Sequence, residues 1–159
     1  MTWLRRAHEA VAPPEHDPDD TPEALLSAMF DLVREVNRNA GKLPLEAVVV
    51  ARRVLDAVRE VIETAADRDL DIHAIVSIRG IVGDYLPTTL RAYLALDPDV
   101  VDTQRPSGRT PSQSLIEQLD TLWSSAMDLL EATRAQDADA LLTQGSFLRT
   151  KFSGSDLDL

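Results

Sequence analysis

The chain has 159 residues, 44% of them hydrophobic, and a formal net charge of −11 at pH 7. This length suffices for one domain with a real core, since a domain near this size buries about 70% of its unfolded surface. The acidic balance excludes broad nucleic-acid binding, and the absence of cysteine excludes disulfides, thiolate metal sites and a cysteine nucleophile.

Residues 1–20 form a leader ahead of the predicted domain. Its proline-rich, acidic part predicts an extended, flexible linker. Before this part, Trp3, Leu4, Arg5 and Arg6 combine two large apolar side chains with two cations, which indicates an attachment point for a membrane or a partner groove. A single turn is too small to anchor a protein alone, so membrane contact is expected to be peripheral at most. The alternative is that Trp3 folds back onto the domain.

Five segments have the caps and the three- and four-residue spacing of amphipathic helices. The first begins at the N-cap Thr21 and ends at Gly41, which we expect in the left-handed conformation of a helix C-cap. The second covers residues 44–69, where the helical period outweighs the strand propensity of three consecutive valines. The third covers residues 71–96, and its apolar stripe consists of Ile72, Ile75, Val76, Ile78, Val82, Leu86, Leu90 and Tyr93.

Pro87 lies in the middle of this third segment, four residues after Gly83. Proline has no amide donor, and its ring presses on the carbonyl four residues earlier, where a glycine can bend at little steric cost. The sequence therefore predicts one helix kinked at Pro87.

An exposed loop is predicted over residues 97–110. Thr110 and Gln113 form a capping box that begins a fourth helix. A short break at residues 135–137, with Asp137 as the cap, begins a fifth, and residues 153–159 predict a disordered tail.

Together these segments predict an all-α fold, with residues 21–152 forming a single-domain antiparallel bundle of about four or five helices. The long hairpin of residues 44–69 and 71–96 is its expected spine. No signal peptide and no apolar run of about 20 residues is visible, so we expect a cytoplasmic protein. The preference for arginine over lysine is typical of a bacterium with a GC-rich genome.

One stretch resembles a known family, and it consists of Tyr85, Leu86, Pro87, Thr88, Thr89, Leu90 and Tyr93, followed by an acidic loop. With Leu119-Asp120-Thr121-Leu122, it resembles the XpaC family of 5-bromo-4-chloroindolyl phosphate hydrolysis proteins, which often occur beside toxic-anion (tellurite) resistance proteins. The likeness covers about residues 45–150. The chain departs from the family by showing no N-terminal hydrophobic segment and by having Asp84, where an aromatic residue is common.

The resemblance implies a helical cytoplasmic protein of poorly defined role, and it identifies no catalytic residue. Our leading hypothesis is a non-enzymatic interaction or scaffold protein, linked to envelope stress or toxic-anion resistance, with a protein partner of unknown identity. A homo-oligomer is left open. The alternative is a weak or metal-assisted phosphohydrolase that acts on phosphate esters.

A phosphohydrolase needs a nucleophile or a metal-bound water, together with positive charge for the phosphoryl oxygens. The sequence has no phosphate-binding glycine loop, HExxH motif or nucleophile elbow, so no catalytic residue, metal or cofactor is predicted. Asp97, Asp99 and Asp102 have a spacing that could bind Mg²⁺ or Ca²⁺, but a helix terminator and a solvated turn explain them more simply.

Two further groups have both a structural and a functional interpretation. Arg52, Arg53 and Arg79 could form a shared anion site, although pairing with nearby carboxylates is favoured. Tyr85 and Tyr93 lie eight residues apart, on roughly one helix face, and core packing is favoured over the binding of another protein.

Overall fold

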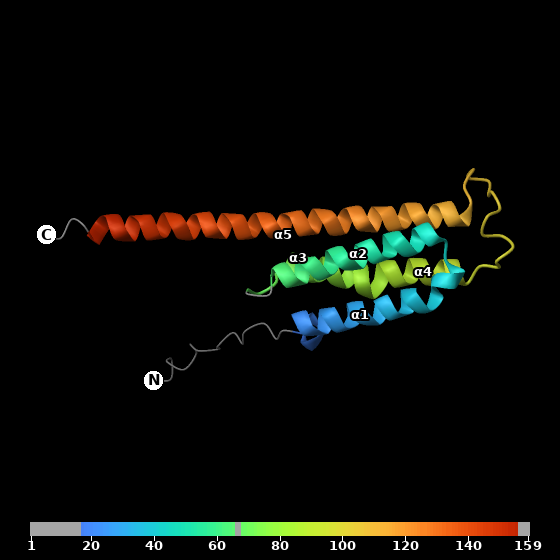
Figure 1. The fold of residues 1–159 in the computed structure, drawn as a ribbon, viewed down its shortest axis with the longest axis horizontal. Helices are drawn as coiled ribbons and strands as arrows, with labels where there is room; N and C mark the ends of the chain where they lie inside the picture. Colours follow the sequence, from blue (N-terminus) through green and yellow to red (C-terminus); the bar gives the residue numbers. More distant parts are fainter. Residues whose placement is uncertain (1–16, 66–67, 156–159) are drawn as a thin grey trace, which may run out of the picture.

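The computed structural model describes residues 17–65 and 68–155, and within these residues every regular element is helical (Figure 1). The predicted all-α fold is therefore confirmed for this part of the chain. Residues 1–16 and 156–159 lie outside it, and so do the predicted attachment residues Trp3, Leu4, Arg5 and Arg6.

Helix α1 spans Pro22–Asn39 and begins as predicted. The Thr21 hydroxyl accepts a hydrogen bond from the amide of Ala24 at 3.2 Å, which satisfies one of the free amides of the first helical turn. Before this cap, Pro18–Asp20 forms a 3₁₀ turn, in contrast to the extended linker that the sequence predicts. The carboxylate of Asp17 starts the turn by accepting a hydrogen bond from the amide of Asp19 at 3.1 Å.

The end of α1 differs from the prediction. Gly41 is not in the left-handed conformation, because among the described residues only Gly108 has a positive φ, of 82°. The chain instead continues into a 3₁₀ turn, Ala40–Lys42, which ends in the extended residue Leu43. Leu43 precedes a proline, and this favours the extended backbone, so the chain leaves α1 without a glycine cap.

The third predicted helix consists of three parts. Helix α3 spans Ile72–Arg79, a π-helical segment spans Gly80–Tyr85, and helix α4 spans Leu86–Leu94. At the end of the π-helical segment the amide of Leu86 donates to the carbonyl of Ile81, five residues earlier. The wider turns therefore end directly before Pro87, which has no amide to donate. The structure therefore has a π-helical segment, Gly80–Tyr85, before Pro87, and it does not show the kink that the sequence predicts at Pro87.

Helix α2, Leu45–Thr64, is the central helix of the fold. Ten of its side chains are buried: Ala47, Val48, Val50, Ala51, Val54, Leu55, Ala57, Val58, Val61 and Ile62. Its most extensive contacts are with α5, the long C-terminal helix Pro111–Ser155, and the next most extensive are with α1. The predicted spine of residues 44–69 and 71–96 is therefore wrong, because the closest packing partner of α2 comes from the far end of the chain.

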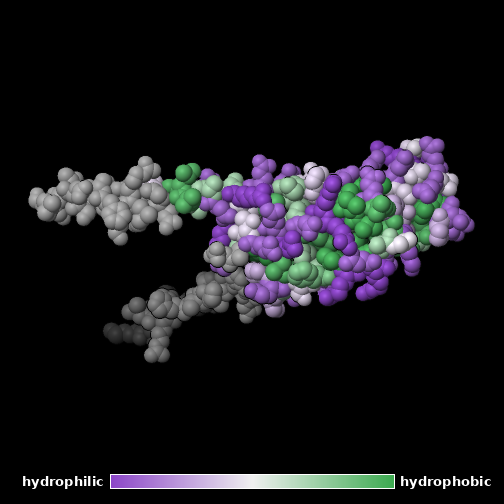
Figure 2. All heavy atoms as spheres, viewed as in Figure 1, coloured by the Kyte–Doolittle hydropathy of each residue, from purple (hydrophilic) through white to green (hydrophobic). Residues whose placement is uncertain are grey.

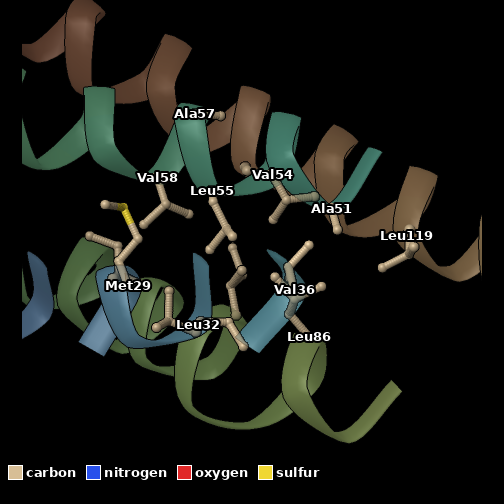
Figure 3. Packing of buried hydrophobic residues seen from close by; sticks show 14 of the residues in the cluster. Met29, Leu32, Val36, Ala51, Val54, Leu55, Ala57, Val58, Leu86 and Leu119 are labelled. Carbon is tan, nitrogen blue, oxygen red and sulfur yellow. The ribbon is translucent and has the colours of Figure 1, made fainter. Parts of the chain in front are cut away.

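The core lies between α2 and the helices on either side of it. Figure 3 shows Met29, Leu32 and Val36 of α1, together with Leu86 of α4, facing Val54, Leu55 and Val58 of α2. Leu119 of α5 extends the same cluster on the other side. Each of these side chains is at most 4% exposed, so the hydrophobic cluster is dry and continuous.

The capping box that begins α5 is confirmed. The amide of Thr110 donates to the side-chain oxygen of Gln113 at 3.0 Å, and the amide of Gln113 donates to the Thr110 hydroxyl at 3.2 Å. The predicted break at residues 135–137 is wrong, because α5 continues through it to Ser155. These residues include no proline or glycine, and Asp137 pairs with Arg68 at 2.6 Å and caps no helix.

With 45 residues, α5 is about 67 Å long, and its C-terminal part extends beyond the other helices (Figure 1). None of the described helices combines the length and the apolar character that would let it cross a membrane.

We predict that Thr110→Ala lowers the free energy of unfolding by about 1 kcal/mol, because alanine cannot accept the hydrogen bond from Gln113. Thr121→Ala is the matched control. Thr121 is an exposed residue inside α5, and its hydroxyl donates to the Glu117 carbonyl of the same helix. This substitution should leave stability unchanged or raise it slightly, because alanine has the higher helix propensity. Urea unfolding followed by circular dichroism measures both variants, and equal losses would contradict the capping role.

Candidate functional site

The residues of the family resemblance divide between the core and the surface. Four of them are buried: Leu86, Pro87, Leu90 and Tyr93. Tyr85 and Thr88 are exposed, and Thr89 is half-buried. In the second element of the resemblance, on α5, Leu119 is buried while Asp120 and Thr121 are exposed. Most of the motif therefore serves packing, and only part of it can contact another molecule.

Tyr93 joins α4 to the beginning of α5. Its hydroxyl lies 2.9 Å from the hydroxyl of Ser112, and both side chains are buried. Each hydroxyl satisfies the other, so the phenol is buried without an unpaired polar group. The structural interpretation of Tyr93 is confirmed.

The same interpretation is wrong for Tyr85, whose side chain is 58% exposed. Tyr85 ends the π-helical segment that Gly80 begins, and its ring lies over Gly80. A β-carbon on Gly80 would be only 3.1 Å from the ring carbon Cε2 of Tyr85. The missing side chain of Gly80 therefore leaves the space that the tyrosine ring occupies. By contrast, a β-carbon on Gly83 would meet no atom within 4 Å.

Two more apolar side chains continue this exposed area along α3. Ile72 and Val76 are 61% and 63% exposed, and they lie one helical turn apart, with Gly80 one turn further on. We call Ile72, Val76, Gly80 and Tyr85 the α3 surface. Isolated exposed apolar residues are common, but a contiguous group on successive turns is typical of an interaction site.

Sequence reasoning missed Ile72 and Val76, because it assigned both to the core stripe. A signal was available in the composition of α3, where Ala74, Ile75 and Ile78 are apolar as well. A short helix with apolar residues on most of its circumference cannot bury all of them against one neighbour. The structure buries Ala74, Ile75 and Ile78, and it leaves Ile72 and Val76 in contact with solvent.

Arg79 ends α3 beside this surface and holds the N-terminal 3₁₀ turn against it. Its guanidinium lies 2.8 Å from a carboxylate oxygen of Asp20 and 3.4 Å from one of Asp17. The hydrogen bond to Asp20, followed by the attraction of its charge, raises the pKa of Arg79. Arg79 is thus already paired within the chain.

The three arginines considered as a shared anion site have separate partners. Arg52 donates to Asn37 of α1, and the guanidinium of Arg53 lies 5.7 Å from the ring centre of Trp123 on α5. Together with the pairing of Arg79, these contacts tie α2 and α3 to their neighbours, as expected for structural arginines. The sequence favours two pairs one helical turn apart, Arg52 with Asp56 and Arg59 with Glu63. The second is present at 3.8 Å, whereas Arg52 donates to Asn37 instead of pairing with Asp56.

The acidic loop has the local geometry of a turn. The carboxylate of Asp97 accepts a hydrogen bond from the amide of Asp99 at 2.9 Å, as expected after a helix end. The carboxylate of Asp84, the nearest acidic residue before the loop, accepts the hydroxyl of Thr88 at 3.2 Å. Within residues 17–65 and 68–155, no group of three or more acidic or histidine side chains has the arrangement of a metal site.

An open pocket of about 240 Å³ lies between the C-terminal end of α4 and the beginning of α5. Thr89 and Tyr93 of the motif contribute to it, and its other lining residues are Ala92, Leu96, Pro111, Ser114, Leu115 and Gln118. This lining can hold a small apolar group, and it presents hydroxyl and amide groups but no charged side chain.

Comparison with protein-family models, with curated proteins and with solved structures finds no match. The resemblance to the XpaC family therefore stays a prediction from the motif residues themselves.

Because some motif residues are buried and others are exposed, truncating one of each kind should change the stability by different amounts. Leu90→Ala should lower the free energy of unfolding by about 2–5 kcal/mol, because it leaves a cavity in the core, where Leu90 is 1% exposed. Tyr85→Ala should change it by only about 0.5 kcal/mol, because the ring is mostly in contact with solvent. Thermal and urea unfolding of both variants measure the difference. A loss at Tyr85 as large as that at Leu90 would show that the tyrosine belongs to the core.

Proposed function

We propose that this chain is a non-enzymatic helical interaction protein of the XpaC-like type, which binds a protein partner through the α3 surface. One observation supports this proposal above the others. Ile72 and Val76 are more than half exposed one turn apart on α3, whose opposite face is packed into the core, and Tyr85 is also more than half exposed, with its ring over Gly80 one turn after Val76. A stable fold gains nothing from leaving three large apolar side chains together in water, whereas a binding surface requires it.

The shape of the α3 surface favours an amphipathic helix as the binding segment of the partner. Ile72, Val76 and Gly80 follow one another at intervals of four residues, which is the ridge that interlocks with a second helix. Tyr85 adds a rigid aromatic group at one end, and tyrosine is among the residues that contribute most to protein interfaces. Exposed His73 and Arg79 supply polar positions around this apolar centre.

The place of the protein in the cell rests on the resemblance. The XpaC family implies a cytoplasmic protein that acts with the toxic-anion or envelope-stress response, so the proposed partner is a protein of that response. A peripheral contact of the N-terminal residues with a membrane would be an addition to this role.

The proposal predicts that Val76→Glu abolishes partner binding, because a carboxylate would be placed in the centre of the α3 surface. Leu45→Glu is the matched control, because Leu45 is 80% exposed and lies on α2, outside the α3 surface. Immobilised wild type and the Leu45 variant should retain the same partner from a lysate. With that partner purified, calorimetry should give an affinity at least tenfold weaker for Val76→Glu, a loss of about 1.4 kcal/mol or more. Equal affinity of the two variants would contradict the proposal.

A second measurement separates this proposal from the phosphohydrolase alternative. Protein freed of contaminating phosphatases should not hydrolyse 5-bromo-4-chloroindolyl phosphate, with or without Mg²⁺, Mn²⁺ or Zn²⁺. The carboxylate of Asp97 already serves the turn that it begins, so the loop presents no prepared metal site. Turnover that disappears in Asp99→Asn or Asp102→Asn would favour the hydrolase instead.

A further inference from the structure

The N-terminal leader reaches the bundle beside the α3 surface. Asp17 and Asp20 both pair with Arg79, at 3.4 Å and 2.8 Å, and the side chain of Asp20 is only 16% exposed. Arg79 directly precedes Gly80 and follows Val76 by three residues, so it borders the α3 surface on its own helix. The chain that precedes Asp17 is therefore tethered next to exposed apolar side chains.

The leader contains an apolar pattern that fits one face of a helix. In the helical period, Trp3, Leu4, Ala7 and Val11 fall within about 100° of one another around the axis. We call residues 3–11 the Trp3 segment. The α3 surface has a ridge of positions four residues apart, and such a ridge accepts a second helix with one apolar face.

The Trp3 segment and the α3 surface also match in length. At 1.5 Å per residue, a helix from Trp3 to Val11 and the ridge from Ile72 to Gly80 would each measure about 12 Å. Asp17 follows Val11 by six residues. That length of chain extends up to about 20 Å, so the Trp3 segment can lie along the whole α3 surface while Asp17 stays in place.

The polar surroundings of the α3 surface suit the charges of the Trp3 segment. On the face of the molecule in Figure 2, hydrophilic residues surround separate hydrophobic areas. At the α3 surface, the exposed Asp69 lies three residues before the first member and the exposed Asp84 directly before the last. The first eight residues of the chain include Arg5 and Arg6 and no carboxylate, although the net charge of the chain is −11. Cations beside an apolar segment thus meet carboxylates beside an apolar surface.

We propose that the Trp3 segment binds the α3 surface of its own chain and thereby competes with the protein partner for this surface. The competition rests on the proposed function, whereas the contact within the chain does not. Because the segment is tethered at Asp17, its effective concentration at the surface is about millimolar. A partner at a lower concentration displaces it only by binding more tightly, so the segment sets a threshold for the interaction.

The first experiment measures the exposure of Trp3 in the full chain. The sequence has two tryptophans, so Trp123→Phe leaves Trp3 as the only one, and acrylamide quenching of its fluorescence reports its contact with water. Trp3 should be protected, and adding Val76→Glu should raise the quenching about twofold, because the carboxylate shifts the segment to its free state. Leu45→Glu is the matched control on α2, at a position that is 80% exposed, and should leave the quenching unchanged.

The conditions of protection identify what Trp3 contacts. Protection that is equal at all protein concentrations supports a contact within one chain. Protection that appears only as the concentration rises would assign Trp3 to a second copy, and protection that appears only with phosphatidylglycerol vesicles would assign it to a membrane. Either result overturns the proposal, and so does protection that Val76→Glu leaves unchanged.

Methyl NMR of the chain with both native tryptophans gives an independent readout. Trp3→Ala should move the methyl resonances of Ile72 and Val76, because the indole ring no longer lies over them. The methyl resonances of Leu45 and Val49, exposed on α2, should stay in place. Resonances of Ile72 and Val76 that do not move would overturn the proposal.

The second experiment measures the competition by calorimetry, with the partner that the wild type retains from a lysate, once purified. Trp3→Ala/Leu4→Ala should bind this partner about three- to tenfold more tightly than the wild type, because a covered surface lowers the apparent affinity by the fraction that is free. Leu45→Ala should leave the affinity unchanged. If Val76→Glu exposes Trp3 without weakening the partner, the proposed function fails and the contact within the chain stands. If Val76→Glu abolishes partner binding while Trp3→Ala/Leu4→Ala leaves it unchanged, the competition is overturned and the proposed function stands.

Discussion

The burial of α2 on two sides is the constraint on which the rest of the structure depends. Val54, Val58 and Val61 are each 0% exposed, although β-branched residues are not the best helix formers. A helix with an apolar face as wide as that of α2 is stable only when other elements cover this face. α1 covers one side of α2 and α5 covers the other, and Leu86 of α4 belongs to the same core cluster (Figures 1 and 3). These three valines therefore lie in a helix, because packing outweighs local propensity.

Two unusual features follow from this central helix. The chain from α3 to α4 has to keep Ile78, Leu86 and Leu90 directed into the core on both sides of a proline, and each of them is at most 1% exposed. The π-helical segment Gly80–Tyr85 achieves this with wider turns directly before the place where Pro87 has no amide to donate. In the same segment Tyr85 is directed outward, with its ring over Gly80. Similarly, α5 is longer than the α2 that it covers, so its apolar face continues past its neighbour.

The sequence predicted the features that depend on neighbouring residues and failed on those that depend on distant ones. Helix starts at Thr21 and Thr110 follow from side chains that bond to amides two or three residues away, so they can be recognised locally. The pairing of α2 with α5 joins segments far apart in the chain, and apolar periodicity shows a face without identifying its partner. For the same reason Ile72 and Val76 were assigned to the core. Their exposure depends on how much surface the neighbours of α3 cover, and a single sequence does not contain that information.

The support of the α3 surface by the fold decides what this surface can do. It lies on a helix whose other face is buried, so its side chains are already in place before a partner arrives, and binding there would lose little conformational freedom. The proposed binding at the α3 surface would therefore depend on how well the shape of a partner fits side chains that the fold already holds in position.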